Sequence, residues 1–246
     1  MLDTVVGKNV VINMLEAGKS INQILLSSSS KRDPKISEIV HLANINNVKF
    51  MYVTKRKLDE IAKESVHQGV VAYIPPREYF EIEDLMEEAE LRNEDPFILI
   101  LDSIEDPHNL GAIIRSAVAA GVHGVVIPER RSVQVNQTVT KVAAGAVEHC
   151  KIARVTNLTT TINWLKKQGV WVFGADTEGS TSYLKTKFAG PVALVLGNEG
   201  KGLSKLVAQS CDHLINIPMY GPVESLNVSV STAILVFKIR EERENG

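Results

Sequence analysis

The sequence predicts an α/β protein with two folded units, and three observations support this prediction. Short apolar runs, typical of strands buried on both faces, alternate with segments of helical periodicity. The alternation stops at Pro75-Pro76, where a strongly acidic segment begins, and resumes after it. In the second half, polar or glycine-rich loops follow the apolar runs, as ligand loops follow the strands of open α/β sheets.

We expect the first unit to span residues 1–75 and to pack helices on a sheet. A segment of about 75 residues can hold a small hydrophobic core of its own. The expected helices cover residues 9–17, 36–44 and 58–62, and the expected strands cover residues 21–26, 48–53 and 70–74.

Residues 76–94 are expected to form an acidic linker between the two units. The apolar residues in it that have the spacing of an amphipathic helix are Ile82, Leu85, Met86 and Ala89. A solvated connector is the favoured interpretation because acidic side chains dominate the segment, and a helix within it is the alternative.

The second unit is expected to span residues 95–246 and to contain a largely parallel sheet. The expected strands cover residues 97–101, 124–127, 151–155, 170–174, 192–196 and 213–217. The expected helices begin at Leu110, cover residues 135–147 and 159–167, and end the chain.

The first loop of interest follows the apolar run 97–101 and leads into a helix. Asn109 is the expected N-cap of this helix, and Gly121 is the expected residue just beyond its end. Arg115 lies off the apolar face, about two turns from the cap, where its side chain can reach back towards the loop.

The second loop, residues 197–202, reads Gly-Asn-Glu-Gly-Lys-Gly. Its three glycines let the backbone bend tightly and approach a ligand closely, although a purely structural turn is the alternative. The spacing matches neither a P-loop nor the dinucleotide fingerprint, so it argues against a nicotinamide-dependent dehydrogenase.

The third loop, residues 216–227, contains two prolines and a glycine and leads into the last helix. The start of that helix offers unpaired backbone N–H groups to an anion, although Ser225 as a simple N-cap is the alternative. The apolar residues that share one face of the helix are Val230, Ala233, Ile234 and Phe237.

Composition restricts the function classes. A formal net charge of −2 over 246 residues argues against a broad basic surface, so any RNA contact depends on local patches. The two cysteines, Cys150 and Cys211, lack metal-ligand spacing and make no disulfide framework, which fits a reducing cytoplasm and predicts no bound metal. No apolar run reaches membrane-spanning length and the N-terminus lacks a signal-peptide core, so we expect no membrane association.

Together the three loops resemble the three motifs of the SpoU-type (TrmH-like) 2′-O-ribose RNA methyltransferases of the SPOUT superfamily. The matching segments are 109–115, 196–203 and 217–227, with Asn198 standing where many relatives have a small hydroxyl residue. The resemblance implies a deep C-terminal trefoil knot, which periodicity alone does not predict. It also implies S-adenosyl-L-methionine as methyl donor, a ribose 2′-hydroxyl as acceptor, no metal, and a homodimer packed through the last helix.

The resemblance implies a polar catalytic group made of Asn109, Arg115, Glu199, Ser225 and Asn227. Arg stays protonated in proteins, so we expect Arg115 to grip an RNA phosphate and stabilise negative charge rather than act as a base. We expect Asn109 to orient Arg115 or the ribose, and a capping or ion-pair role is the alternative for Glu199.

The resemblance also implies main-chain contacts to the cofactor from Gly197, Ile217 and Leu226, although Ile217 ends a strand and a core position is its alternative. The weaker cofactor candidates are Thr177, Asn198 and Met219.

The first unit resembles the L30e-like RNA substrate-binding domain attached to many of these enzymes, through residues 6–17 and 66–72. The candidate phosphate contacts in it are Lys31, Arg32, Lys55, Arg56 and Lys57, and a solvated charged face is the alternative. Aromatic residues make up only 5% of the chain, so we expect no broad platform for base stacking.

The architecture most resembles the RlmB-like enzymes, which methylate a guanosine of 23S rRNA in the large ribosomal subunit. Three alternatives stay open: a thiostrepton-resistance-like adenosine methyltransferase, a tRNA guanosine methyltransferase and a noncatalytic RNA-binding assembly factor. The sequence does not identify the modified nucleotide.

Overall fold

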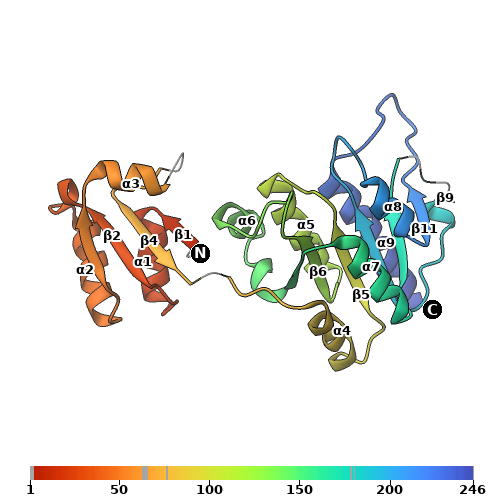
Figure 1. Cartoon of the computed structure of the whole chain (residues 1–246), viewed down its shortest axis with the longest axis horizontal. Coiled ribbons are helices and arrows are strands. Elements are labelled where there is room, and N and C mark those ends of the chain that lie inside the picture. The colour runs from red at the N-terminus through yellow and green to blue at the C-terminus, as the bar shows by residue number, and fades with distance from the viewer. Residues whose placement is uncertain (1–2, 63–65, 76, 178, 180, 246) are drawn as a thin grey trace. The chain divides into compact units, whose positions relative to one another are not determined.

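The computed structural model describes residues 3–62, 66–75, 77–177, 179 and 181–245. The chain divides into two compact units, Met1–Glu78 and Tyr79–Gly246 (Figure 1). The α/β class predicted from the sequence is confirmed in both.

The N-terminal unit contains a mixed four-stranded sheet in the order β1-β4-β2-β3. Its strands are β1 (Asp3–Val6), β2 (Gln23–Ser27), β3 (Phe50–Val53) and β4 (Val70–Ile74). Strands β2 and β3 are parallel, whereas β4 runs antiparallel to β1 and β2. Strand β1 is not among the strands predicted from the sequence, because its short apolar stretch adjoins the helix that follows and has no periodicity of its own.

Two helices, α1 (Lys8–Glu16) and α2 (Pro34–Ile45), contribute to the larger core of this unit, and α3 (Lys55–Ala62) contributes to a second core cluster. A short 3₁₀ turn, η1 (Ser28–Ser30), follows β2. Helix α2 begins where it does because the Asp33 side chain accepts a hydrogen bond from the Lys35 N–H at 3.0 Å and Pro34 occupies the first helical position.

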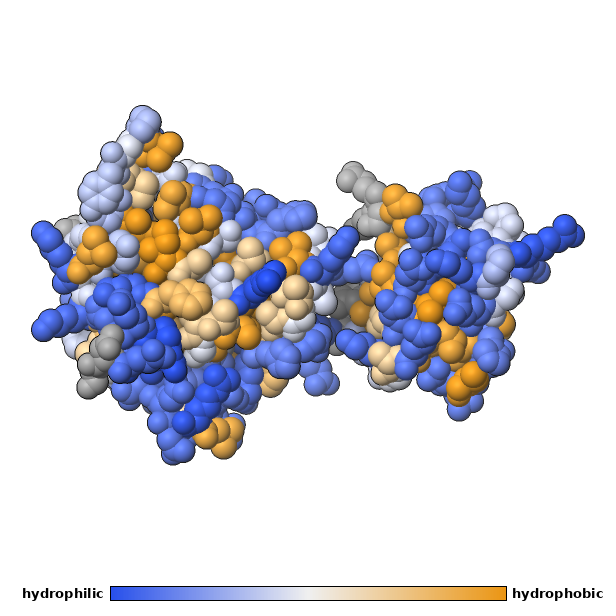
Figure 2. Space-filling model, turned by 180° about the vertical axis from the view of Figure 1, so that it is seen from behind, coloured by the Kyte–Doolittle hydropathy of each residue, from blue (hydrophilic) through white to orange (hydrophobic). Residues whose placement is uncertain are grey.

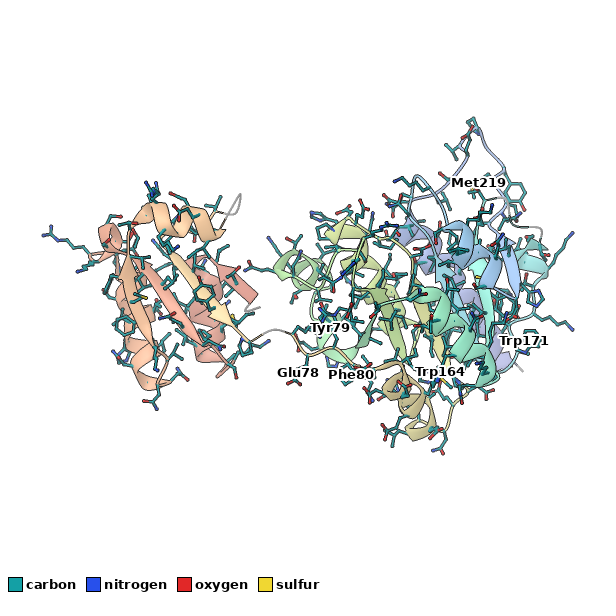
Figure 3. The ribbon with its side chains drawn as sticks, in the orientation of Figure 1. Glu78, Tyr79, Phe80, Trp164, Trp171 and Met219 are labelled. Atoms are coloured by element: carbon teal, nitrogen blue, oxygen red, sulfur yellow. The ribbon has the colours of Figure 1, made fainter. Side chains whose placement is uncertain are left out.

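Residues 79–91 belong structurally to the C-terminal unit. The Phe80 N–H donates to the carbonyl of Ile152 at 3.0 Å, and the guanidinium of Arg154 lies 4.6 Å from the ring centre of Tyr79 (Figure 3). Helix α4 (Ile82–Leu91) then buries Leu85 completely. A Cβ on Gly124 would lie only 2.2 Å from the Leu85 side chain, so glycine is required there for the helix to approach the sheet.

This differs from the solvated connector that the sequence favoured. The apolar face of α4 includes Ile82, Leu85 and Ala89, and all three are buried in the C-terminal unit. Among the acidic residues that suggested a connector, Glu83, Glu87 and Glu90 are exposed, whereas Glu88 is half-buried and pairs with Lys151 at 3.1 Å.

The C-terminal unit contains seven parallel strands in the order β7-β6-β5-β10-β8-β11-β9. They are β5 (Phe97–Leu101), β6 (Gly124–Pro128), β7 (Lys151–Val155), β8 (Trp171–Ala175), β9 (Thr181–Ser182), β10 (Val192–Leu196) and β11 (His213–Asn216). Strands β5, β6 and β10 are buried along their whole length, which explains their uninterrupted apolar sequences.

Helices cover both faces of this sheet. One core cluster packs α5 (Pro107–Ala119), α6 (Gln137–Val142) and α9 (Val228–Asn245) on one face. The other packs α4, α7 (Leu158–Lys167) and α8 (Lys205–Ser210) on the opposite face. The remaining 3₁₀ turns are η2 (Ala146–His149) and η3 (Tyr183–Lys185).

The helix predicted over residues 135–147 is divided in the structure into α6 and η2. Ala144 and Gly145 between them have φ values of 50° and 88°, in the left-handed region that ends a helix. The periodicity of the sequence continues across this break and therefore concealed it.

Helix α9 has two apolar faces. The face that packs on the sheet and α5 includes Leu235, Val236 and Ile239, which are fully buried. The face predicted from periodicity points outward instead, and Val230 and Phe237 on it are 47% and 49% exposed. Figure 2 shows hydrophobic side chains gathered on the C-terminal unit in the view from behind.

Candidate active site

A cavity of about 490 Å³ lies at the carboxyl ends of the central strands of the C-terminal unit. This is within the range of about 300–1,000 Å³ that small-molecule sites occupy. Its walls are the glycine-rich loop after β10, the loop after β8 and the loop between β11 and α9. Met219 lies on the last of these loops, which Figure 3 shows at the top of the unit.

The glycine-rich loop closes on itself. The Asn198 N–H donates to the Gly202 carbonyl at 3.0 Å, and the Gly202 N–H donates back at 2.8 Å. Gly202 has a φ of 64°, and a Cβ on Gly197 would lie 2.2 Å from the Gly202 carbonyl carbon. Both glycines are therefore required for the turn, which presents the backbone of residues 197–202 to the cavity.

A buried carboxylate fixes this loop from behind. Asp102, which is only 5% exposed, accepts hydrogen bonds from the Ser204 N–H at 2.8 Å and from Ser103 Oγ at 2.9 Å. The Asn198 side chain donates to the Ser103 carbonyl at 3.0 Å. Asp102 is not among the site residues predicted from the sequence. The one sequence feature that pointed to it is its position as a charged residue directly after a buried strand.

Three predicted catalytic residues from three separate segments form one hydrogen-bonded network. Asn109 Nδ2 donates to Glu199 Oε1 at 2.5 Å, and Asn227 Nδ2 donates to the same oxygen. Asn227 Nδ2 also lies 3.1 Å from Asn109 Oδ1. The Glu199 carboxylate thus joins the start of α5, the glycine-rich loop and the start of α9.

The sequence had suggested Asn109 as the N-cap of its helix, but the structure shows that it is not. Its side chain is therefore available for this network. Helix α5 begins earlier, with Asp106 as N-cap and Pro107 in the first helical position. The Asp106 side chain accepts from the His108 N–H at 2.9 Å. Asn109 therefore lies in the first turn, 8% exposed, with its side chain directed at Glu199.

Ser225 is not the cap of α9 either. That helix begins at Val228, and Asn227 Oδ1 accepts from the Ser229 N–H at 2.9 Å, as the side chain of a capping residue does. Ser225 stays in the preceding loop, where it is exposed and lines the cavity together with Glu199.

Arg115 lies apart from these residues within the single chain. It is exposed on α5, it does not line the cavity, and it makes no hydrogen bond or ion pair with any residue that the structure describes. A free guanidinium at this position is available to a molecule outside the chain.

All the predicted cofactor residues line the cavity: Gly197, Ile217, Leu226, Thr177, Asn198 and Met219. Several other lining residues were not predicted from the sequence, among them Asp176, Lys201, Glu224 and Ser231. The described residues contain no group of three or more His, Cys, Asp or Glu side chains placed to hold a metal ion.

The candidate RNA contacts of the N-terminal unit lie close together. Lys31 Nζ lies 4.8 Å from the ring centre of Tyr52, and Ser28 Oγ donates to the Val53 carbonyl at 2.8 Å, so the turn that carries Lys31 adjoins the start of α3. Arg32, Lys55, Arg56 and Lys57 are exposed in the same part of the unit. Glu60 partly compensates this charge, at 3.3 Å from Arg56 and 3.7 Å from Lys57.

Family models match both units. Residues 96–237 match the SpoU rRNA methylase family, and residues 4–80 match the substrate-binding domain of RNA 2′-O-ribose methyltransferases. The fold and the site thus define an RNA methyltransferase that uses S-adenosylmethionine. The chain belongs to the SpoU rRNA methylase family, whose model covers more than half of it.

Similar proteins agree with this assignment. YacO of Bacillus subtilis, assigned to the TrmH family of tRNA/rRNA methyltransferases, is 42% identical over 98% of this chain and 96% of its own length. A TrmH-family protein of Staphylococcus saprophyticus is 43% identical over 97% of this chain and 95% of its own length.

Solved structures with the same fold include an AdoMet-bound rRNA methyltransferase from Sinorhizobium meliloti, with a TM-score of 0.68 and 26% identity over 98% of this chain and 87% of that one. The SpoU methyltransferase AviRb from Streptomyces viridochromogenes, in complex with AdoMet, is similar in fold, with a TM-score of 0.73 and 20% identity over 100% of this chain and 91% of that one. Helices long and apolar enough to cross a membrane do not occur in the described part of the chain.

Proposed function

We propose that this protein methylates the 2′-hydroxyl of a guanosine in 23S rRNA, as RlmB-like enzymes do. The observation that carries the proposal is the network of Asn109, Glu199 and Asn227, which joins three loops beside a cavity of the size of a small-molecule site. The substrate-binding domain matched at residues 4–80 supports an RNA substrate.

The residues around the cavity fit S-adenosylmethionine, which supplies an electrophilic methyl group. We assign main-chain contacts with it to Gly197, Ile217 and Leu226. The close approach of the Gly197 and Gly202 backbones leaves no room for a side chain at Gly197, so main-chain atoms rather than a side chain present themselves at this wall of the cavity. We assign weaker contacts to Thr177, Asn198 and Met219.

We assign to Arg115 the grip on a phosphate beside the target ribose. Its guanidinium is a fixed positive charge, so it lowers the energy of the negative charge that develops on the 2′-oxygen, and the phosphate that it grips takes the proton of the 2′-hydroxyl as the methyl group is transferred. We assign to Glu199, with Asn109 and Asn227, the role of holding the loops in the geometry for in-line transfer. We assign to Ser225, which lines the cavity, a contact with the ribose.

We further propose a homodimer that packs through the outward face of α9. Val230 and Phe237 on that face are half-exposed, and leaving these apolar side chains in water costs free energy. The opposite face of the helix already packs in the hydrophobic core, so the helix cannot bury both faces within one chain. Helix α5, which carries Arg115, packs beside α9, so a partner on this face lies near the free guanidinium.

The test is to map 2′-O-methyl groups in rRNA and tRNA from wild-type cells, deletion cells and deletion cells that express the Arg115→Ala variant. The expected result is one guanosine of 23S rRNA that loses its methyl group in both mutant strains. Loss at an adenosine or in a tRNA would replace the proposed substrate, and unchanged methylation throughout would favour an assembly factor.

A further inference from the structure

A second cavity, of about 290 Å³, lies on the C-terminal unit at the other end of the strands. Its lining residues are Trp171, Phe173, Thr181, Thr186, Lys187, Ala189, His213 and Ile215. Figure 3 shows Trp171 well apart from Met219, which belongs to the first cavity. Trp171 and His213 are the first residues of β8 and β11, whereas the first cavity is lined by the carboxyl-terminal parts of these strands. Ile215 of β11 lines both cavities.

Three rings form the floor of this cavity. Trp171 and Phe173 are two residues apart on β8 and therefore share a face, and His213 of β11 pairs in register with Phe173. The Trp171 and His213 ring centres are 5.8 Å apart at 27°, and those of His213 and Phe173 are 5.2 Å apart at 28°. Trp171 is 52% exposed and His213 is exposed, because the core under α9 reaches Phe173 but not these two rings.

The wall of the cavity carries uncompensated positive charge. Lys187 lines it and Lys185 lies two residues earlier, and neither makes a hydrogen bond or ion pair with any part of the chain that the structure describes. The carboxylates of neighbouring segments already have partners. Glu242 accepts from the Phe188 N–H at 2.9 Å and pairs with Lys238, and Asp212 pairs with Lys166 at 2.7 Å.

We propose that this cavity binds one nucleotide of a single-stranded RNA segment, with the base on the Trp171 and His213 rings and a phosphate on Lys187. Aromatic rings on a sheet surface accept bases of any identity, and a neighbouring ammonium group neutralises the backbone phosphate. The low aromatic content of the chain argues against a broad platform, but one base needs only these rings. The inference rests on the proposed function, because the strand belongs to the RNA substrate.

Trp171 itself reports on this site. The chain has two tryptophans, so the Trp164→Phe variant of the full-length protein leaves Trp171 as its only one. A short oligouridylate, titrated without methyl donor, is expected to quench Trp171 emission in a saturable way. His213→Ala or Lys187→Glu in this background should weaken the binding on the order of 10-fold. Lys167→Glu, the same charge change at an exposed lysine on α7, should leave it unchanged.

Several results would overturn the inference. They are an emission that does not respond to the oligonucleotide, equal affinity in Lys187→Glu and Lys167→Glu, or binding of uridine monophosphate as tight as that of the oligonucleotide. Dissociation of a dimer by Lys187→Glu would also overturn it, since the cavity would then be an interface between two copies. Methyl transfer to rRNA is measured in parallel. If the Trp171 emission does not change in a protein that methylates RNA, only this inference is contradicted. If the emission is quenched as expected in a protein that does not methylate RNA, only the proposed function is contradicted.

Discussion

At the scale of single residues, Arg115 and Glu199 differ in what the chain provides for them. Glu199 accepts two side-chain amide hydrogen bonds within the chain, whereas Arg115 has no partner among the described residues. A group that is already satisfied positions its neighbours, and a free charged group is available to substrate. Replacing Glu199 is therefore expected to disturb the arrangement of the loops, whereas replacing Arg115 is expected to remove a contact with the substrate.

Arg115→Ala should remove most methyl transfer and leave cofactor affinity nearly unchanged. The loss of one preorganised charge-stabilising group raises a barrier by about 2.7–4 kcal/mol. Radiolabelled methyl transfer and calorimetry with S-adenosylmethionine measure the two effects. Arg130→Ala, at another exposed arginine of the same unit, is the control and should retain activity. Turnover of Arg115→Ala equal to that of Arg130→Ala would remove Arg115 from the mechanism.

Gly197→Ala should weaken cofactor binding by at least about 10-fold, which corresponds to about 1.4 kcal/mol. The added Cβ would lie 2.2 Å from backbone atoms of Gly202, and backbone cannot move aside as a side chain does. Gly200→Ala is the matched control in the same loop, because the nearest atom to its Cβ is 3.8 Å away. Calorimetry on both folded variants tests the prediction, and equal affinities would place the cofactor elsewhere.

At the scale of elements, a buried histidine connects the start of β5 to the segment before β6. His123 Nδ1 accepts from the Phe97 N–H at 2.9 Å, and its side chain is fully buried. Burial, and after it the charge of Arg92, lower the pKa of His123 from 6.5 to about 4, against the opposing effect of Glu94. The imidazole is therefore neutral in the folded protein at pH 7.

This depressed pKa predicts a loss of stability in acid. The unfolded chain binds a proton at His123 below pH 6.5 and the folded chain only near pH 4, so the contribution is fully present above pH 6.5 and is lost as the pH falls towards 4. The upper limit of the loss is about 3 kcal/mol. Urea unfolding at several pH values should show a smaller pH dependence in His123→Asn than in the wild type. Parallel curves for the two proteins would contradict the prediction.

The last helix gives a second prediction at this scale. Phe237→Glu places a charge on the outward face of α9, so it should shift the proposed dimer towards monomer without unfolding the chain. Light scattering coupled to size exclusion measures the mass, and circular dichroism measures the fold. The control is Leu206→Glu, at a residue of α8 that is 68% exposed on the other helical layer, which should leave the mass unchanged. A monomeric wild type, or a Phe237→Glu dimer of wild-type affinity, would refute an interface on this face.

At the scale of the whole molecule, the division between the units determines which fragment can function. A fragment starting at Tyr79 retains α4 and should fold and bind the cofactor, because Leu85 and its neighbours complete one core of the sheet. A fragment starting at Glu94 loses α4, exposes that core and should unfold at lower urea concentration. The Tyr79 fragment should also lose most rRNA methylation, since we assign RNA affinity to the N-terminal unit. Equal methylation by this fragment and the full chain would contradict that assignment.

The sequence by itself determined the α/β class, most strands and the three motif loops. Buried parallel strands such as β5 and β10 are uninterrupted apolar runs, and glycines mark the turn at Gly197 and Gly202, because these constraints act on a local stretch of chain. Only the tertiary structure decided which side chains meet. Glu199 lies 90 residues from Asn109 and 28 from Asn227, so no local pattern encodes their contact. The same holds for α4, whose acidic face suggested a connector. Its burial depends on Gly124 of a distant strand, which leaves the space that Leu85 fills.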